Sequence, residues 1–320
     1  MIFFIYPYPL KSLMLRTRLR DFIITRDDWI FAVADYCHEG GIRSILRYVP
    51  DPQGARGADK KYRKMDFDDA FMFMKTARPE WVNDVHVVPW DSVKEILAPD
   101  KRLPHIMEKN EKVKTIVKSL QDHVPVEYMG VTGSLLPGLE IDSSDIDFIV
   151  YGSSWFTARD IIKREKDKKD PITEISDDMW RDIYKKRRPD ISFEEFLIHE
   201  TRKGNRGMVG GTYFDLLYVR DWKDITPCLR GIDIGNKTIE ATVTNADFAF
   251  DSPAIYKIDH PEISYVLSYT HTYAGQGLPG ERIEARGMVE IVGNMKRLVV
   301  GTTREPKGEW IRSLTLLEGI

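Results

Sequence analysis

Two aspartates, Asp145 and Asp147, have the spacing that most clearly indicates chemistry in this 320-residue chain. They open the apolar segment DIDFIVY, which is typical of a buried β-strand. Because side chains alternate along a strand, both carboxylates point to one face, with Cα atoms about 6.6 Å apart. Two charges this close repel by roughly 3 kcal/mol at an effective dielectric constant of 20. The pair therefore predicts a bound divalent cation such as Mg²⁺, which prefers oxygen ligands.

The turn before this strand carries groups that bind phosphate. Gly133 and Ser134 directly follow the apolar segment YMGVT. A glycine lets the backbone N–H groups approach a phosphate closely, and the serine hydroxyl adds a donor. Mg²⁺ commonly completes its ligand shell with phosphate oxygens. A phosphate cradle beside a carboxylate pair thus predicts phosphoryl or nucleotidyl transfer.

The combined pattern resembles a known signature. G-S-x-x-x-G, about seven further residues, then S-D-I-D and an apolar strand is similar to the signature of the DNA polymerase β-type nucleotidyltransferase superfamily. Gly133, Ser134 and Gly138 match its glycine-serine turn, and Asp145 and Asp147 match its paired metal ligands. The match covers roughly a quarter to a third of the chain. The whole layout also resembles a group of uncharacterised predicted nucleotidyltransferases from archaea.

The resemblance implies further site residues. The superfamily usually places a third carboxylate on a later strand, and Asp215 in GGTYFDLLYV is the candidate. Many members carry an arginine shortly after the serine to meet the triphosphate, whereas this chain has LLP there. The candidate replacements are Arg202, Lys203 and Arg206 in ETRKGNRGMVGG, which the glycines predict to be a loop.

The implied reaction moves a nucleoside monophosphate from a nucleoside triphosphate such as ATP to an acceptor hydroxyl and releases pyrophosphate. Two Mg²⁺ ions, or Mn²⁺, would be held by Asp145, Asp147 and Asp215 about 3.5 to 4 Å apart. An RNA 3′ end, a protein hydroxyl and a small metabolite are all compatible acceptors, and we rank RNA slightly ahead. The alternatives are a catalytically quiet module that binds nucleotide or RNA, and a scaffold with nucleotide as a structural ligand.

Composition sets outer bounds on function. With 42% hydrophobic and 30% charged residues and a net charge of −3, the chain predicts a soluble protein without overall attraction to nucleic acid. Cys37 and Cys228 offer neither a disulfide framework nor a zinc site, which favours a reducing cytoplasm. The start MIFFIYPYPLKSLML predicts neither a spanning helix nor a signal peptide, and translation from Met14 is as natural as from Met1. No membrane partner is expected, and the oligomeric state is not predicted.

The periodicity of apolar residues and the positions of turn residues predict an α+β fold of three modules, at residues 16–104, 105–228 and 229–320. The first is β-rich: a meander over residues 20–51, a helix over FDDAFMFMKTA capped by Asp66 or Asp68, and a strand at DVHVVP. We interpret WDSVKEIL as a short helix and APDKRLPHIM as a connection.

The central module begins with a helix over residues 111–120 and alternates strands and helices to DLLYVR in a mixed sheet. The third module is an antiparallel sheet or small barrel. The basic runs IKREKDKK and YKKRRPD are interpreted as solvated helix faces. His86, His123, His260 and His271 have no partner at metal-ligand spacing and are expected to be core or surface residues.

Overall fold

The computed structural model describes residues 16–226, 229–301 and 308–319, which form two compact units. Unit 1 comprises the described residues up to Ala98 together with Leu136–Leu139, and unit 2 comprises Pro99–Leu135 and the described residues from Glu140 onward. The predictions for residues 1–15, including the start at Met14, and for Cys228 lie outside the described residues. Within those residues, every helix is too short or too polar to span a bilayer.

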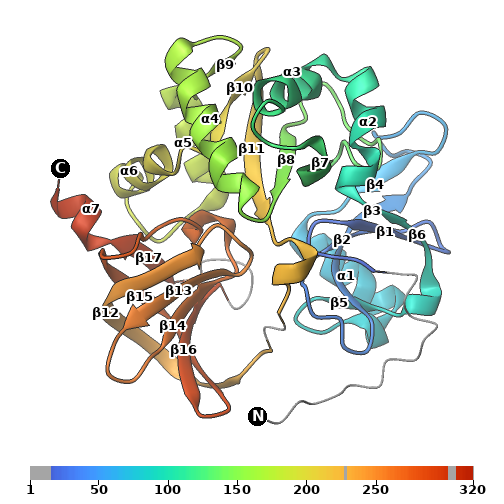
Figure 1. The fold of residues 1–320 in the computed structure, drawn as a ribbon. Helices are drawn as coiled ribbons and strands as arrows, with labels where there is room; N and C mark the ends of the chain where they lie inside the picture. Colours follow the sequence, from blue (N-terminus) through green and yellow to red (C-terminus); the bar gives the residue numbers. More distant parts are fainter. Residues whose placement is uncertain (1–15, 227–228, 302–307, 320) are drawn as a thin grey trace. The chain divides into compact units, whose positions relative to one another are not determined.

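Unit 1 is built on an antiparallel sheet with the strand order β4-β3-β2-β1-β6, in which β5 also pairs with β3 (Figure 1). Helix α1 (Phe67–Ala77) begins where the Asp66 side chain accepts a hydrogen bond from the Asp69 N–H at 2.8 Å. The predicted meander, helix and strand at 84–89 are therefore confirmed. The strands are β1 (Phe22–Thr25), β2 (Ile30–Val33), β3 (Ile42–Pro50), β4 (Tyr62–Lys64), β5 (His86–Val88) and β6 (Val93–Leu97).

The short helix expected at WDSVKEIL is wrong. Only Trp90–Ser92 form a helical turn (η3), and the rest is strand β6, whose Leu97 pairs with Phe22 of β1. An unpaired β1 edge would leave backbone N–H and C=O groups without partners. Pairing along the edge therefore overrides the local helical pattern.

The first part of unit 2 is a five-stranded mixed sheet with the order β7-β8-β11-β10-β9, in which only β8 and β11 run parallel (Figure 1). Helices α3 and α4 pack on one face, where Ile116 and Trp155 meet Phe148 and Phe214. Its strands are β7 (Met129–Thr132), β8 (Ile146–Tyr151), β9 (Ile172–Thr173), β10 (Arg206–Val209) and β11 (Thr212–Val219). Its helices are α2 (Pro99–Lys109), α3 (Glu111–Leu120), α4 (Ser154–Lys168), α5 (Asp177–Arg187) and α6 (Phe193–Lys203).

The predicted bounds of α3 are confirmed, whereas the connection expected at APDKRLPHIM is wrong. That segment is helix α2, with Pro104 in its interior. A proline inside a helix costs about 3 kcal/mol. Leu103 and Ile106, 0% and 6% exposed, bury apolar surface worth roughly 1.5 to 3 kcal/mol each and offset that cost.

The second part of unit 2 is a sheet in which β12 pairs with both β13 and β15, so that the order β12-β13-β14-β16-β15 closes into a ring. We call this the C-terminal barrel. It differs from the expected antiparallel sheet in one place, because β14 and β16 run parallel. Its strands are β12 (Ile232–Phe248), β13 (Ala254–Asp259), β14 (Tyr265–Ser268), β15 (Arg282–Val292), β16 (Met295–Val300) and the added edge strand β17 (Trp310–Ser313), followed by α7 (Leu314–Glu318).

Helices α5 and α6 share the hydrophobic core of the barrel. Trp180 of α5 and Phe196 of α6 are buried in one cluster with Tyr256, Ile283 and Val300. The α+β class of the fold is confirmed, with helices and three sheets in one chain. The predicted boundaries at residues 104 and 228 stay predictions.

Candidate active site

Two of the predicted acids are direct neighbours across the sheet. Asp147 of β8 and Asp215 of β11 are register partners in the parallel pair. On the outer sides, Thr132 of β7 pairs with Asp147, and Arg206 of β10 pairs with Asp215. Paired residues on adjacent strands point to the same face, with strands about 4.8 Å apart. One row of four side chains therefore crosses the sheet and brings both carboxylates together.

The third predicted acid extends this arrangement along β8. Asp145 directly precedes the strand and is exposed to solvent. If the strand's alternation continues back to this residue, it lies on the same face as Asp147, while Ile146 and Phe148 enter the core on the other face. A solvent-accessible carboxylate beside a half-buried one is a suitable oxygen donor pair for a hard cation.

The glycine-serine turn contacts this carboxylate pair. Gly133 has φ +68°, and a β-carbon added to it would lie 2.1 Å from Asp147 Oδ2. Ser134, next in the turn, is 9% exposed. The absence of a side chain at Gly133 thus makes room for the Asp147 carboxylate directly against the backbone turn. Gly138 belongs to the Leu136–Leu139 segment of unit 1, and its predicted phosphate contact stays a prediction.

Asp215 is surrounded by two arginines and a histidine. Arg206 Nε donates to Asp215 Oδ1 at 2.5 Å, whereas Arg187 Nη2 and His271 Nε2 lie 3.7 and 3.8 Å from Oδ2. Burial alone would raise the pKa of Asp215, but Arg206, His271 and Arg187 hold that pKa well below its usual range. The carboxylate is therefore ionised at any working pH, and its charge is already balanced without a metal.

A second buried acid shares these cations. Glu200 of α6 is 2% exposed and accepts a hydrogen bond from Lys203 Nζ at 2.5 Å. It also pairs with Arg206, and Arg187 Nη1 lies 3.5 Å from its Oε2. Two acids and three basic side chains thus form one network, which we call the buried ionic network. Removing any single member would leave a buried charge uncompensated.

These observations test whether the site suits Mg²⁺. Asp145 and Asp147 fit, since Asp147 Oδ2 lies against the backbone of the Gly133 turn and Asp145, two residues earlier, is a solvent-exposed carboxylate. Asp215 adds an adjacent carboxylate, but its Oδ1 is bonded to Arg206. Within the part of the chain that the structure describes, no group of three or more His, Cys, Asp or Glu side chains forms a ready metal site.

The predicted loop cations lie on regular structure instead. Arg202 and Lys203 end helix α6 and Arg206 begins β10, so the expected glycine-rich loop is wrong. Arg202 donates to Glu281 at 2.5 Å and to the Gln276 carbonyl at 2.6 Å, while Lys203 and Arg206 belong to the buried ionic network. Their contact with phosphate stays a prediction.

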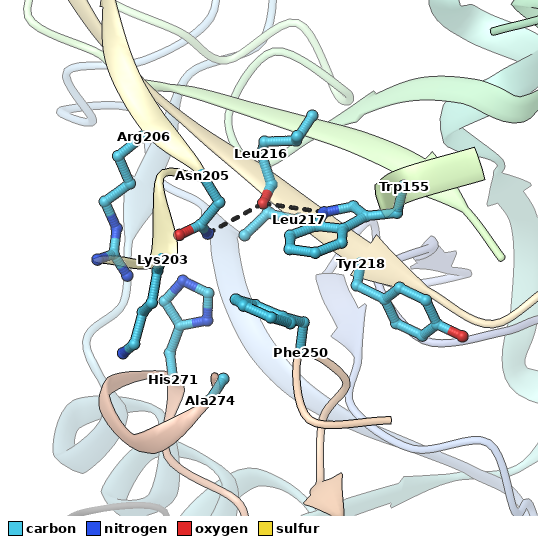
Figure 2. A pocket seen from close by; sticks show the side chains of 10 residues that line it. All are labelled: Trp155, Lys203, Asn205, Arg206, Leu216, Leu217, Tyr218, Phe250, His271 and Ala274. Atoms are coloured by element: carbon cyan, nitrogen blue, oxygen red, sulfur yellow. Dashed lines mark hydrogen bonds between the residues drawn. The ribbon is translucent and has the colours of Figure 1, made fainter. Parts of the chain in front are cut away.

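A small cavity lies beside the network, with Lys203, Asn205, Arg206 and His271 on its polar side (Figure 2). Also at the cavity wall, Asn205 Nδ2 and Trp155 Nε1 both donate to the Leu216 carbonyl at 3.2 Å. The cavity measures about 10 Å³. That volume suits one water molecule, whereas ligand pockets measure roughly 300 to 1,000 Å³. This cavity is therefore too small for a nucleotide.

Sequence reasoning missed three residues around Asp215. Arg187 follows buried Trp180 by seven positions and so shares its helix face, which contradicts the solvated reading of YKKRRPD at this residue. Glu200 likewise follows buried Phe196 by four. Helical periodicity could have flagged both.

The third missed residue, His271, lies in the turn η6 (His271–Tyr273) of the C-terminal barrel. Burial lowers its pKa to about 3 despite the nearby Asp215, so its imidazole is neutral. The local sequence HTYAG contains no pattern that predicts this position. Of the other histidines, His86 is a core residue, as expected.

Comparisons with known proteins identify the domain that carries part of this site. A family model described as a nucleotidyltransferase domain matches residues 111–201, a span that includes Gly133, Ser134, Asp145 and Asp147 and ends before Asp215. The chain is also similar to an uncharacterised protein of Methanocaldococcus jannaschii, MJ1086. The two are 40% identical over 340 residues, which cover 93% of this chain and 99% of the relative. No solved structure matches the chain.

Proposed function

We propose, from the premise that this chain belongs to the family of that uncharacterised archaeal protein and contains a nucleotidyltransferase domain, that it transfers a nucleoside monophosphate to an acceptor hydroxyl. The donor is a nucleoside triphosphate and the leaving group is pyrophosphate. One observation chiefly supports this function: Asp147 is adjacent to Asp215 across the sheet and packed against the Gly133 turn.

The turn and the acids have separate roles in this proposal. Gly133 and Ser134 bind the β- and γ-phosphates through the backbone and the hydroxyl. Asp145, Asp147 and Asp215 are the residues that would hold Mg²⁺ or Mn²⁺, with two ions in the proposed reaction. When bound, the metal would neutralise triphosphate charge. The acceptor oxygen bonds to the α-phosphorus as the bond to the β-phosphate oxygen breaks.

Asp215 orients groups in this site and is not its general base. A catalytic base works best when its pKa lies near the working pH. Arg206, His271 and Arg187 keep the pKa of Asp215 well below its ordinary value, so it would hold a transferred proton poorly. The acceptor proton passes to solvent or to a phosphate oxygen instead.

The acceptor that we favour is an RNA 3′ end. The C-terminal barrel provides a β-rich module next to α5 and α6, and some small β-barrels bind single strands of nucleic acid. A protein hydroxyl and a small metabolite are the competing acceptors. If a cationic side chain contacts the triphosphate in addition to the metal, it would be Arg202, Lys203 or Arg206. Each of them would first have to give up a hydrogen bond or ion pair within the protein.

A catalytically quiet nucleotide-binding module is the second candidate function. The observation in its favour is that Arg206 and the buried ionic network already neutralise Asp215. Such a module would bind nucleotide without breaking it. Saturation at 100 times the dissociation constant would then stabilise the protein by about 2.7 kcal/mol, with no loss of nucleotide over time.

Both candidates are tested by one labelling experiment. Wild type and Asp147→Asn are incubated with each α-labelled nucleoside triphosphate, Mg²⁺ and fractionated cell extract, and the fractions are then counted. Transfer predicts label in one class of acceptor with wild type alone. Equal labelling with both proteins would refute the proposed site, and ligand-induced stabilisation without any label would support the quiet module.

A further inference from the structure

The two carboxylate oxygens of Asp215 have different surroundings. Oδ1 accepts a short hydrogen bond from Arg206 Nε at 2.5 Å. Oδ2 lies farther from its basic neighbours, 3.7 Å from Arg187 Nη2 and 3.8 Å from His271 Nε2. Both contacts exceed ordinary hydrogen-bond length. Oδ2 is therefore the less tightly paired of the two oxygens and the better candidate to take a ligand.

His271 approaches Oδ2 from a turn that is fixed on several sides. Lys203 Nζ of α6 donates to the carbonyl of Thr272 at 2.8 Å in a buried hydrogen bond. The carbonyl of Tyr273 accepts a hydrogen bond from Tyr256 OH at 2.7 Å, and the Tyr273 hydroxyl accepts one from the Asp190 N–H at 3.1 Å. These bonds hold the backbone of η6, so the imidazole reaches Asp215 from a rigid support.

The ring nitrogen that faces Asp215 has no hydrogen-bond partner among the described residues. His271 Nε2 is buried, although 35% of the whole side chain is exposed. A buried N–H without a partner costs roughly 1 to 3 kcal/mol. A movement of well under 1 Å would bring Nε2 within hydrogen-bond distance of Oδ2. Figure 2 shows the ring beside Lys203 and Asn205 at the cavity.

We propose that His271 is a positioning residue for Asp215, so that the C-terminal barrel completes the active site. Its Nε2–H group holds Oδ2 in the orientation that receives a ligand, while Arg206 fixes Oδ1. This inference rests on the proposed function, and it extends that function to a part of the chain outside the matched nucleotidyltransferase domain. Partners that orient a ligating carboxylate typically contribute 10- to 100-fold to metal affinity or activity.

Two substitutions separate positioning from packing. His271→Gln keeps an N–H donor near the place of Nε2, whereas His271→Phe keeps a flat ring and removes the donor. His123→Ala is the matched control, since His123 is exposed and far from the network in sequence. Mn²⁺ affinity is measured by electron paramagnetic resonance with the metal alone, kcat and KM are measured with labelled nucleoside triphosphate, and thermal unfolding checks the fold.

The expected result is that His271→Phe weakens Mn²⁺ binding and lowers kcat by about tenfold or more, with little change in KM. His271→Gln should stay within about threefold of wild type in both, as should His123→Ala. Equal loss in the Gln and Phe variants, or none in the Phe variant, would overturn the inference. If wild type binds Mn²⁺ but transfers no nucleotide, the proposed function fails while the Mn²⁺ series still decides the role of His271.

Discussion

Gly133 and Asp147 lie so close together that Asp147 Oδ2 occupies the space a β-carbon on Gly133 would need, 2.1 Å away. Two segments of the nucleotidyltransferase domain are thereby fixed against each other, the Gly133–Ser134 turn and strand β8. The positive φ of Gly133 adds a second reason for glycine at this position.

Replacing Gly133 with alanine should therefore damage both stability and activity. We expect Gly133→Ala to lose more stability than the roughly 1 to 2 kcal/mol of left-handed backbone strain, because the carboxylate must also move. Gly211→Ala is the matched control: Gly211 has φ +74° and open space around the added β-carbon, so only strain is expected. Urea unfolding and turnover measured on both variants give the comparison, and equal losses would contradict the close contact.

Removing the charge of Asp147 should abolish transfer and leave the fold intact. Asp147→Asn keeps the shape of the side chain but loses the anionic ligand, and metal assistance is worth several kcal/mol, so we expect turnover to fall by at least about 1,000-fold. Asp142→Asn, in the exposed turn before the strand, should behave like wild type. Near-normal turnover by Asp147→Asn, with an unchanged circular dichroism spectrum, would rule out the metal assignment.

Arg206 should be the most costly cation to remove from unit 2. It pairs with both Glu200 and Asp215, and a buried ion pair that loses one partner destabilises a protein by about 3 to 5 kcal/mol. We expect that loss for Arg206→Met in urea unfolding. Lys185→Ala is the control, since its ion pair with Asp182 is about three-quarters exposed and should contribute less than about 0.5 kcal/mol. Similar losses in both variants would show that the buried ionic network contributes little to stability.

Stability should fall in mild acid because of His86. Burial lowers the pKa of His86 from 6.5 to about 4, and its Nδ1 accepts a hydrogen bond from the Leu46 N–H at 3.1 Å. Below pH 6.5 the unfolded chain therefore binds a proton that the folded chain does not. The contribution of His86 to the free energy of unfolding is complete above pH 6.5. It decreases as the pH falls toward 4 and is about 2 kcal/mol smaller at pH 5. Proton NMR should show a His86 ring that does not titrate above pH 5, and a midpoint near 6.5 would contradict its burial.

Local pattern was sufficient for the central strands and for α3. The spacing of Val113, Ile116, Val117 and Leu120 predicts the helix, and all four are buried in it. The D-x-D strand and the buried face of Ile146 and Phe148 were predicted from alternation along the chain. Helix α2 and strand β6 were missed because a buried core and an open sheet edge, which lie outside any short window, override Pro104 and the charges of VKEIL.

The surroundings of Asp215 were harder to predict. Arg187, Glu200 and His271 come from α5, α6 and the C-terminal barrel, and each is charged or polar in a stretch that looks solvated. Only tertiary packing assembles them. Periodicity could place Arg187 and Glu200 on buried faces, but no sequence signal connects His271 with Asp215.

The shared core of α5, α6 and the barrel constrains how this gene can be cut or recombined. A shortened protein ending near residue 228 would present Trp180 and Phe196 to water, since their packing partners Tyr256, Ile283 and Val300 would be gone. We expect such a fragment to aggregate when it is expressed alone. Chimeras between homologues should fold only if α5, α6 and the barrel strands that cover them come from the same parent.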